Sequence, residues 1–286
     1  MDQQDTSFTV EAFATLWQEE QNDRPEQEKF WNFRSTRYNQ HVKRTKEDPN
    51  WDKLYAWLSD LGGIQPSFNV LDIGCGPGKF AVNFAKRDHA VTALDISEGM
   101  LEKAKANSSE AGVAQQIQFI HAPWEQLTPA DLGSDGFDLV FASKTPGISS
   151  LEAIAKMNQV SRHGCFYSNF VYKRNPLQNR LRSLLGLPEK TYREGDAVYA
   201  TFNVLWLEGY YPALQYLERD WEIEWQLDEA IEYFTLYFEA EQEHPLSADQ
   251  QNRLQSALQQ DAAQHQGVVL EQVQSKLAWM YWNVKR

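Results

Sequence analysis

The feature that most constrains this chain is an apolar run that ends in closely spaced glycines. Residues 70–78 read Val-Leu-Asp-Ile-Gly-Cys-Gly-Pro-Gly, and a second apolar run, 90–94, closes on Asp95. At the end of a buried parallel strand, glycines allow a sharp turn and let a ligand lie against main-chain N–H groups, because no Cβ intervenes. A carboxylate that ends the next strand can accept hydrogen bonds from ribose hydroxyls. The pattern therefore predicts a site for a nucleoside cofactor.

Two common nucleotide-binding motifs fit this loop poorly. The dinucleotide fingerprint needs a small sixth residue in Gly-x-Gly-x-x-Gly, and the chain has Lys79 there. The phosphate-binding loop of nucleotide triphosphatases needs Gly-x-x-x-x-Gly-Lys-Ser/Thr, but Ile73 stands at its first glycine and Phe80 at its hydroxyl residue. The mismatch at Lys79 argues against a nicotinamide-dependent oxidoreductase, which is kept only as a minor alternative.

Alternating strand and helix signals surround the loop. Apolar runs predict strands at 69–73, 90–94, 117–121, 137–142 and 164–171. Apolar stripes at helical spacing predict helices over 78–87, from Ser97 as N-cap to 107–109, and over 151–157. Such repeated units predict an α/β fold with a mainly parallel sheet that is covered on both faces. Ligands of these sheets bind beyond the carboxyl ends of the strands.

The spacing Asp-x-Gly-x-Gly-x-Gly from Asp72 to Gly78, with Asp95 closing the next strand, resembles the class I (Rossmann-like) S-adenosylmethionine-dependent methyltransferases. The resemblance covers residues 68–171 well and the rest loosely. It implies S-adenosylmethionine as cofactor and S-adenosylhomocysteine as product. It also implies a Rossmann-like, seven-stranded, mostly parallel sheet with an antiparallel last strand.

The resemblance implies the roles of the residues around the loop. Asp72 orients the amino group of the methionine part, and Asp95 holds the ribose hydroxyls. The residues expected to pass beneath the methionine part are Gly74, Cys75, Gly76 and Gly78.

At the adenine end, the resemblance places Ile96 on one face of the base with Met100 supporting it. The chain departs from the family at Pro123, where an Asp commonly accepts from the adenine amino group. Trp124 and Glu125 are predicted to substitute for that Asp. Packing in the core is the open alternative for Ile96, Met100 and Trp124.

The loop after the fourth strand faces the methyl group in the family. Methyl transfer from a sulfonium is an in-line displacement, in which alignment and exclusion of water supply most of the acceleration. A general base is needed only if the acceptor must first lose a proton. Ser143 is expected near the methionine part, Lys144 as a base or a contact for an anion, and Thr145 as a residue that positions the acceptor. A solvated Lys144 is the alternative.

The flanking sequence exceeds what this fold needs. Residues 1–66 are predicted as an N-terminal helical cap, 67–172 as the cofactor-binding core, 173–219 as a helical and aromatic substrate insertion, and 220–286 as closing strands with a helical insertion, all in a single catalytic unit. By the resemblance to the methyltransferases, Tyr38 within the cap is expected to reach the methionine carboxylate; an ordinary packed helix is the alternative. The sixth strand is predicted at 221–225 and the antiparallel seventh at 276–284.

The aromatic C-terminal third is predicted to form the acceptor pocket, since aromatic rings make rigid walls. The candidate pocket residues are Tyr172, Arg174, Tyr199, Asn203 and Tyr210. A local basic patch of Lys173, Arg174, Arg180 and Arg182 favours an anionic acceptor. The alternatives are that the rings form the insertion's own core and that the basic residues lie on a solvated helix face.

Composition narrows the partners. The 286 residues carry a formal net charge of −13, which opposes binding to a phosphate backbone and favours a small-molecule acceptor over nucleic acid. Two cysteines far apart in the chain offer no disulfide framework, so a cytoplasmic location is expected. No zinc-binding spacing, secretory segment or membrane span is found, so neither a metal nor a membrane is expected. A cofactor-binding module or sensor without transfer activity is the principal alternative.

Overall fold

A computed structural model describes residues 9–16, 28–29, 31–32, 35, 39, 49–187, 196–242 and 244–285. The chain forms two compact units. Unit 1 comprises Met1–Asn169, Gly195–Gln215 and Ala278–Arg286, and unit 2 comprises Phe170–Glu194 and Tyr216–Leu277. The four-part division expected from the sequence stays a prediction.

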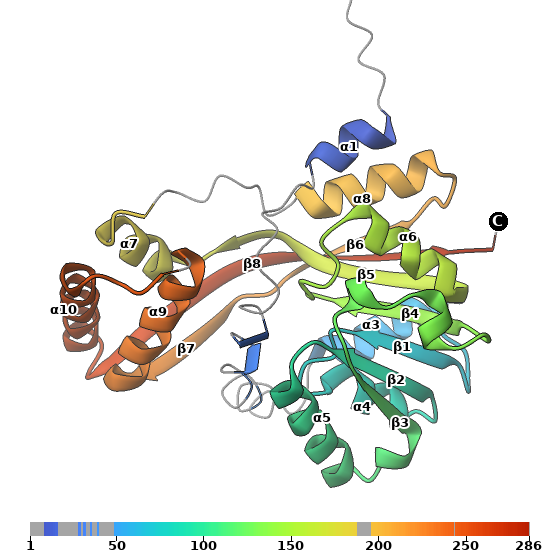
Figure 1. Cartoon of the computed structure of the whole chain (residues 1–286), viewed down its shortest axis with the longest axis horizontal. Coiled ribbons are helices and arrows are strands. Elements are labelled where there is room, and N and C mark those ends of the chain that lie inside the picture. Colours follow the sequence, from blue (N-terminus) through green and yellow to red (C-terminus); the bar gives the residue numbers. More distant parts are fainter. Residues whose placement is uncertain are drawn as a thin grey trace, which may run out of the picture. The chain divides into compact units, whose positions relative to one another are not determined.

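Unit 1 is built on parallel strands that lie side by side (Figure 1). They are β1 (Asn69–Ile73), β2 (Ala90–Asp95), β3 (Ile117–His121), β4 (Phe137–Ser143) and β5 (Ser161–Arg174). In the sheet β1 pairs with β2 and β4, β2 also pairs with β3, and β4 also pairs with β5, all in parallel. The predicted ranges of the first four strands are confirmed to within one residue, whereas β5 is longer than predicted. Because every strand points the same way, their carboxyl ends meet at one edge.

The complete sheet has eight strands in the order β3-β2-β1-β4-β5-β8-β6, with β7 paired to β8. The later strands are β6 (Ala213–Glu218), β7 (Trp221–Gln226) and β8 (Val268–Asn283). β8 is antiparallel to β7. The Val284 N–H, just past the end of β8, donates to the His163 carbonyl near the start of β5 (2.9 Å), as antiparallel neighbours do. The predicted fold class and antiparallel last strand are confirmed.

The prediction of seven strands misses β6, and the strand predicted as the sixth is β7. The two strands are separated only by Arg219 and Asp220. Ser275 of β8 fills that interruption, since its N–H donates to Asp220 Oδ1 (3.0 Å) and its hydroxyl donates to the Arg219 carbonyl. The sequence of β6, Ala-Leu-Gln-Tyr-Leu-Glu, lacks the alternation of apolar and polar residues that marks a strand, and none of its residues is buried.

Helices cover both faces of the parallel sheet. On one face, Phe84 of α4 (Lys79–Ala85) packs edge-on against Trp51 of α3 (Pro49–Asp60) and against Phe141 of β4, at centroid distances of 4.9 and 5.3 Å. On the other face, Asn158 of α6 (Leu151–Val160) accepts a hydrogen bond from the Trp282 indole of β8 (2.7 Å). This agrees with the predicted parallel sheet that is covered on both faces.

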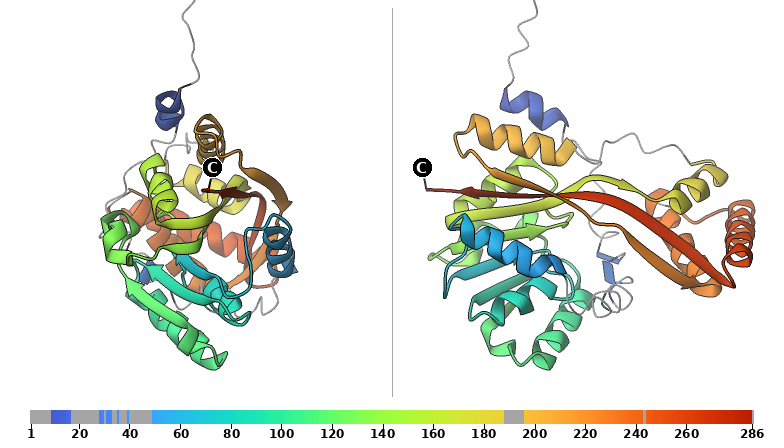
Figure 2. Two further views of the ribbon diagram at one scale, coloured as in Figure 1. Left: turned by 90° about the vertical axis from the view of Figure 1, so that its right-hand side faces the viewer. Right: turned by 180° about the vertical axis from the view of Figure 1, so that it is seen from behind.

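The remaining helices of unit 1 lie beside this core. α5 (Glu98–Glu110) begins after its N-cap Ser97, as predicted. α1 (Val10–Leu16) lies beside α8 (Asp196–Leu207), where Phe13 meets Tyr199 edge-on at 5.7 Å (Figure 2). The short helices are η1 (Ala114–Gln116), η2 (Trp124–Gln126) and η3 (Pro129–Leu132). Among the residues that the structure describes, none of the helices combines the length and apolar character needed to cross a membrane.

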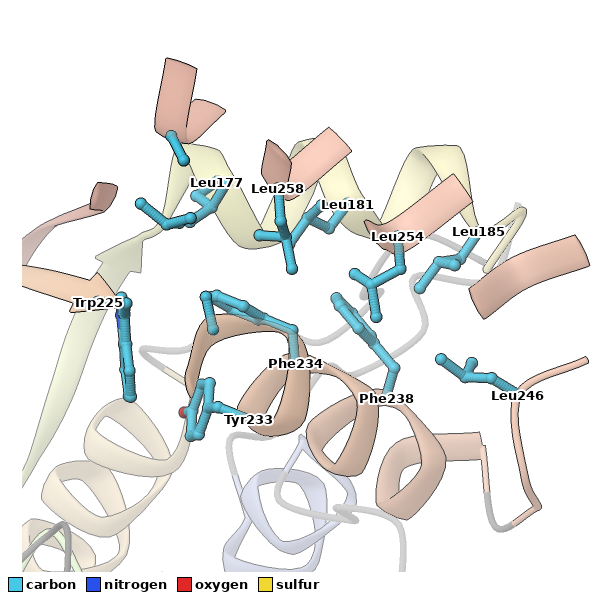
Figure 3. Packing of buried hydrophobic residues seen from close by; sticks show 13 residues of the cluster. Leu177, Leu181, Leu185, Trp225, Tyr233, Phe234, Phe238, Leu246, Leu254 and Leu258 are labelled. Carbon is cyan, nitrogen blue, oxygen red and sulfur yellow. The ribbon is translucent and has the colours of Figure 1, made fainter. Parts of the chain in front are cut away.

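Unit 2 has a hydrophobic core of its own. Its helices are α7 (Pro176–Leu184), α9 (Leu227–Gln242) and α10 (Ala248–Gln264). Figure 3 shows Phe234 and Phe238 of α9 directed toward leucines of α7 and α10. Trp225 and Tyr233 belong to the same cluster, with their rings stacked at 4.6 Å. Four aromatic residues of the C-terminal third thus belong to this core, whereas the candidate pocket residues Tyr172, Tyr199 and Tyr210 do not.

Candidate functional site

A glycine turn joins β1 to α4. Gly74, Gly76 and Gly78 all have positive φ values (66°, 54° and 81°), a backbone conformation that is unfavourable for residues with a Cβ. A Cβ added to Gly74 would lie 2.0 Å from Thr145 Oγ1. Both the backbone conformation and the close approach of the β4 loop therefore require glycine at this position.

Asp95, at the end of β2, accepts hydrogen bonds from both the glycine turn and the N-cap of α5. Its Oδ2 accepts the Gly76 N–H and its Oδ1 accepts the Ser97 N–H, both at 2.8 Å. Burial raises the pKa of Asp95, and the two backbone N–H groups oppose that rise. Each carboxylate oxygen has two lone pairs, so each can accept one further hydrogen bond.

Asp72, on β1, is buried (1% exposed), and its Oδ2 has no hydrogen-bond partner among the described residues. Burial and then the charge of Asp95 raise its pKa to about 7, while the Ala81 N–H lowers it. A buried oxygen without a partner costs free energy, which a donor from a ligand would recover. The site thus presents two neighbouring carboxyl groups, and one oxygen of Asp72 lacks a partner among the described residues.

The end of β4 and its loop close the site beside the glycine turn. Thr145 is buried, and its hydroxyl oxygen accepts the Gly147 N–H (3.2 Å). Lys144 has a left-handed backbone (φ 54°), and its N–H donates to the Ser168 carbonyl (2.8 Å). Ser143 pairs with Ser168 in the sheet register. These predicted residues therefore lie together at the carboxyl edge.

Ser168 belongs to this edge and was not predicted. Its side chain is 1% exposed, and its hydroxyl has no partner within the described ranges. The available signal was a serine inside the apolar run Gly-Cys-Phe-Tyr-Ser of β5. A single serine in a strand is common, so the sequence alone does not distinguish it.

At the predicted adenine end, the residues have different surroundings. Ile96 is half-buried, and its carbonyl is 2.8 Å from His121 Nε2. Met100 is buried, and its N–H donates to the Ser97 hydroxyl (3.1 Å). Trp124 is buried against α6, where its indole N–H donates to the Ala153 carbonyl (3.4 Å). Glu125, on the same turn as Trp124, is exposed.

The predicted cap residue Tyr38 lies outside the described residues. Its neighbours Asn32, Ser35 and Asn39 are described, and they contact α5 or its N-cap Ser97. Asn32 Oδ1 accepts the Ser97 hydroxyl (2.6 Å) and the Gly99 N–H (2.9 Å). These asparagines were not predicted, because nothing in the sequence pairs them with residues more than sixty positions away.

The candidate acceptor residues fall in two units. Tyr172 and Arg174 are exposed on the part of β5 that belongs to unit 2. Tyr199, Asn203 and Tyr210 lie on or just after α8 in unit 1, where the Asn203 amide donates to the Tyr199 carbonyl (2.7 Å). The structure therefore places the described cofactor candidates within one unit but divides the acceptor candidates between two.

The basic patch of unit 2 is largely engaged with its own neighbours. Arg180 pairs with Asp261 (2.6 Å), and Arg182 pairs with Glu241. The Lys173 ammonium lies 5.6 Å from the Phe170 ring centroid. Arg182 is buried, so the patch is not simply a solvated helix face, and the preference for an anionic acceptor stays a prediction.

Comparison with known proteins places the site in context. Residues 70–164 match the family model described as a methyltransferase domain. The chain is 34% identical over 87 residues to a tRNA 5-carboxymethoxyuridine methyltransferase of Escherichia coli, covering 29% of this chain and 33% of that enzyme. It is 29% identical over 106 residues to a ubiquinone biosynthesis O-methyltransferase of Bordetella avium, covering 37% and 40%. The chain thus matches about a third of the first of these relatives and two fifths of the second.

Among solved structures, the chain is similar to magnesium protoporphyrin IX methyltransferase from Synechocystis PCC 6803 with bound SAH. The identity is 22% and the TM-score is 0.44, with 63% of this chain and 76% of that chain covered.

Proposed function

Residues 70–164 belong to the methyltransferase domain family, and from this premise we propose that the protein binds S-adenosylmethionine and transfers its methyl group to an acceptor. The observation that carries the proposal is the pairing of a glycine turn with two buried carboxyl groups at adjacent strand ends. Asp72 and Asp95 supply these carboxyl groups, and Gly76 donates to Asp95. A non-catalytic cofactor-binding module is the alternative that the transfer assay below addresses.

The residues present fit the chemical groups of this cofactor. Asp72 Oδ2, which lacks a partner among the described residues, can accept from the amino group of the methionine part. The remaining lone pairs of Asp95 suit two adjacent ribose hydroxyls. At Gly74, Gly76 and Gly78 no Cβ stands between a ligand and the backbone, which supports close approach of the methionine part.

The bound cofactor supplies an activated methyl group on a sulfonium, ready for in-line displacement. The chain's own contribution is to align the acceptor and to exclude water. Ser143, Lys144 and Thr145, at the end of β4, are the proposed contacts for the methyl-bearing end and the acceptor. The buried hydroxyl of Ser168, beside them, is a further proposed contact.

We propose a small molecule as the acceptor. The net charge of −13 supports this, because it disfavours long-range attraction to a phosphate backbone. Transfer to tRNA is the second candidate, favoured by the similarity to a tRNA-modifying enzyme. Cys75 and Cys165 are free thiols, which supports the proposed location in a reducing cytoplasm.

Isothermal titration with S-adenosylhomocysteine tests the cofactor assignment. The wild-type protein should bind at micromolar concentration, and Asp95→Ala should lose most of that affinity. Asp138→Ala is the matched control, because the Asp138 carboxylate also accepts a backbone N–H, from Asn69 (2.9 Å), at the opposite end of β1. Binding of reduced nicotinamide dinucleotide in place of S-adenosylhomocysteine would contradict the proposal.

Incubation with isotopically labelled methyl donor tests transfer and its acceptor. A metabolite extract and a purified tRNA fraction should be supplied separately, with products identified by mass spectrometry. The proposal predicts label in a small molecule and none in tRNA. Label confined to tRNA would favour the second candidate, and binding without any transfer would favour the non-catalytic module.

A further inference from the structure

The start of α5 is held by a residue from far upstream in the chain. Asn32 Oδ1 accepts the Ser97 hydroxyl (2.6 Å) and the Gly99 N–H (2.9 Å). Ser97 is the N-cap of α5, and its hydroxyl oxygen accepts the Met100 N–H (3.1 Å). Asn32 thus satisfies a second N–H of the first helical turn and fixes the direction of the N-cap hydroxyl.

These contacts continue directly into the cofactor edge. The Ser97 N–H donates to Asp95 Oδ1 (2.8 Å), and Asp95 Oδ2 accepts the Gly76 N–H (2.8 Å). A continuous series of hydrogen bonds therefore runs from Asn32 through Ser97 and Asp95 to the glycine turn. The Asp95 carboxylate thus lies between the glycine turn and Ser97, the residue that Asn32 contacts.

A second asparagine pair reaches the same turn from α5. The Asn107 amide donates one hydrogen bond to Asn39 Oδ1 (2.7 Å) and another to the Pro77 carbonyl (2.9 Å). Pro77 lies between Gly76 and Gly78. The glycine turn is therefore connected to Asn39 through a single side chain.

Asn32 and Ser35 pack closely against Gly99. A Cβ added to Gly99 would lie 3.0 Å from Ser35 Oγ and 3.3 Å from Asn32 Oδ1. Ser35 is itself 5% exposed, and its hydroxyl donates to the Asn32 carbonyl (2.8 Å). The contact can thus be disturbed from either side, through Asn32 or through Gly99.

We propose that Asn32 and Asn107 are positioning residues that hold Asp95 and the glycine turn in the conformation that binds the cofactor. This inference rests on the proposed function and deepens it. Neither residue needs to touch the cofactor, because each acts through a group that does. A site held in its binding conformation loses less conformational freedom on binding, so removal of these contacts should weaken affinity.

Titration with S-adenosylhomocysteine of four variants tests this. Asn32→Leu removes the acceptor oxygen and should weaken binding about tenfold, because the variant must order Asp95 and the glycine turn when it binds the ligand. Asn32→Asp keeps acceptor oxygens in the same place and should restore affinity to within about twofold of wild type. Asn107→Asp replaces the donating amide and should weaken binding. Asn283→Leu is the control, because Asn283 Oδ1 also accepts a backbone N–H, from Lys285 (2.7 Å), near the end of the chain.

A second measurement separates positioning from general stability. Hydrogen exchange of the Gly99 amide should accelerate in Asn32→Leu and remain slow in Asn32→Asp. Gly99→Ala should reproduce the loss of affinity, and combining it with Asn32→Leu should add little, because both disturb one contact.

The possible failures are distinguishable. If wild type does not bind S-adenosylhomocysteine, the proposed function and this inference both fall. If wild type binds and Asn32→Leu binds equally well, only the positioning role is overturned. Should Asn32→Leu fail to fold, Asn107→Asp and Gly99→Ala decide the question by the same titration.

Discussion

The most distinctive perturbation is Asp72→Asn, which removes a buried ionisable group while keeping its shape. The pKa of Asp72 is about 7 in the folded protein, against an ordinary value of 3.8. A carboxyl group whose pKa is raised on folding does not reduce stability below its ordinary pKa, where it is protonated in both the folded and the unfolded protein. As the pH rises from the ordinary pKa to the folded pKa, the unfolded protein ionises more readily, so the folded protein loses stability. The difference corresponds to on the order of 4 kcal/mol between about pH 4 and about pH 7.

Chemical denaturation across this pH range measures the effect. The unfolding free energy of wild type should fall relative to that of Asp72→Asn, by up to about 1.4 kcal/mol per pH unit in the steepest part of the curve. The difference between the two proteins should reach a plateau above about pH 8, where the group is ionised in both states. The Asn amide oxygen can still accept the Ala81 N–H that Asp72 accepts in wild type.

Ser168→Ala is the matched control. Like Asp72 Oδ2, the Ser168 hydroxyl is buried and has no partner among the described residues, but the hydroxyl is uncharged at these pH values. Its unfolding free energy should follow the wild-type pH dependence. If Asp72→Asn and wild type show the same pH dependence, Asp72 is not buried in the way described, and the reasoning is refuted.

Three further results are expected. Gly74→Ala should lower the unfolding free energy by more than Gly62→Ala, because both positions have positive φ (66° and 69°) but only a Cβ at Gly74 would meet Thr145. Gly62→Ala should lower it by about 1–2 kcal/mol. Equal losses of the two variants in thermal unfolding would contradict the clash at Gly74. Binding of S-adenosylhomocysteine at about pH 6 should release protons, because a ligand ammonium beside Asp72 stabilises its charged form; titration heats that do not depend on the buffer's ionisation enthalpy would show otherwise. Asp95→Asn should weaken binding at least about tenfold, because one oxygen that accepts hydrogen bonds becomes a donating amide; unchanged affinity would exclude Asp95 from the site.

The sequence predicts the core of unit 1 well because its signals are local. The strand from 69 to 73, its glycine turn and the N-cap Ser97 each follow from residues adjacent in the chain, and the structure confirms them. The strand from 213 to 218 is missed, because its pairing depends on distant β8 rather than on its own apolar pattern.

The candidate site divides in the same way. Asp72 and Asp95 are predictable because each ends or occupies an apolar run. The contacts of Asn32 and Asn107 are not, since they join segments more than sixty residues apart through side-chain amides. The engagement of Arg180 and Arg182 with carboxylates of unit 2 is equally invisible in sequence, because each partner lies on a different helix.

A crystal structure of the protein in complex with S-adenosylhomocysteine tests the central claim most directly. The account predicts electron density for the ligand over the glycine turn, with its ribose hydroxyls within hydrogen-bonding distance of Asp95 and its amino group beside Asp72. Density for a different compound at this edge, or none at saturating ligand, would contradict the claim.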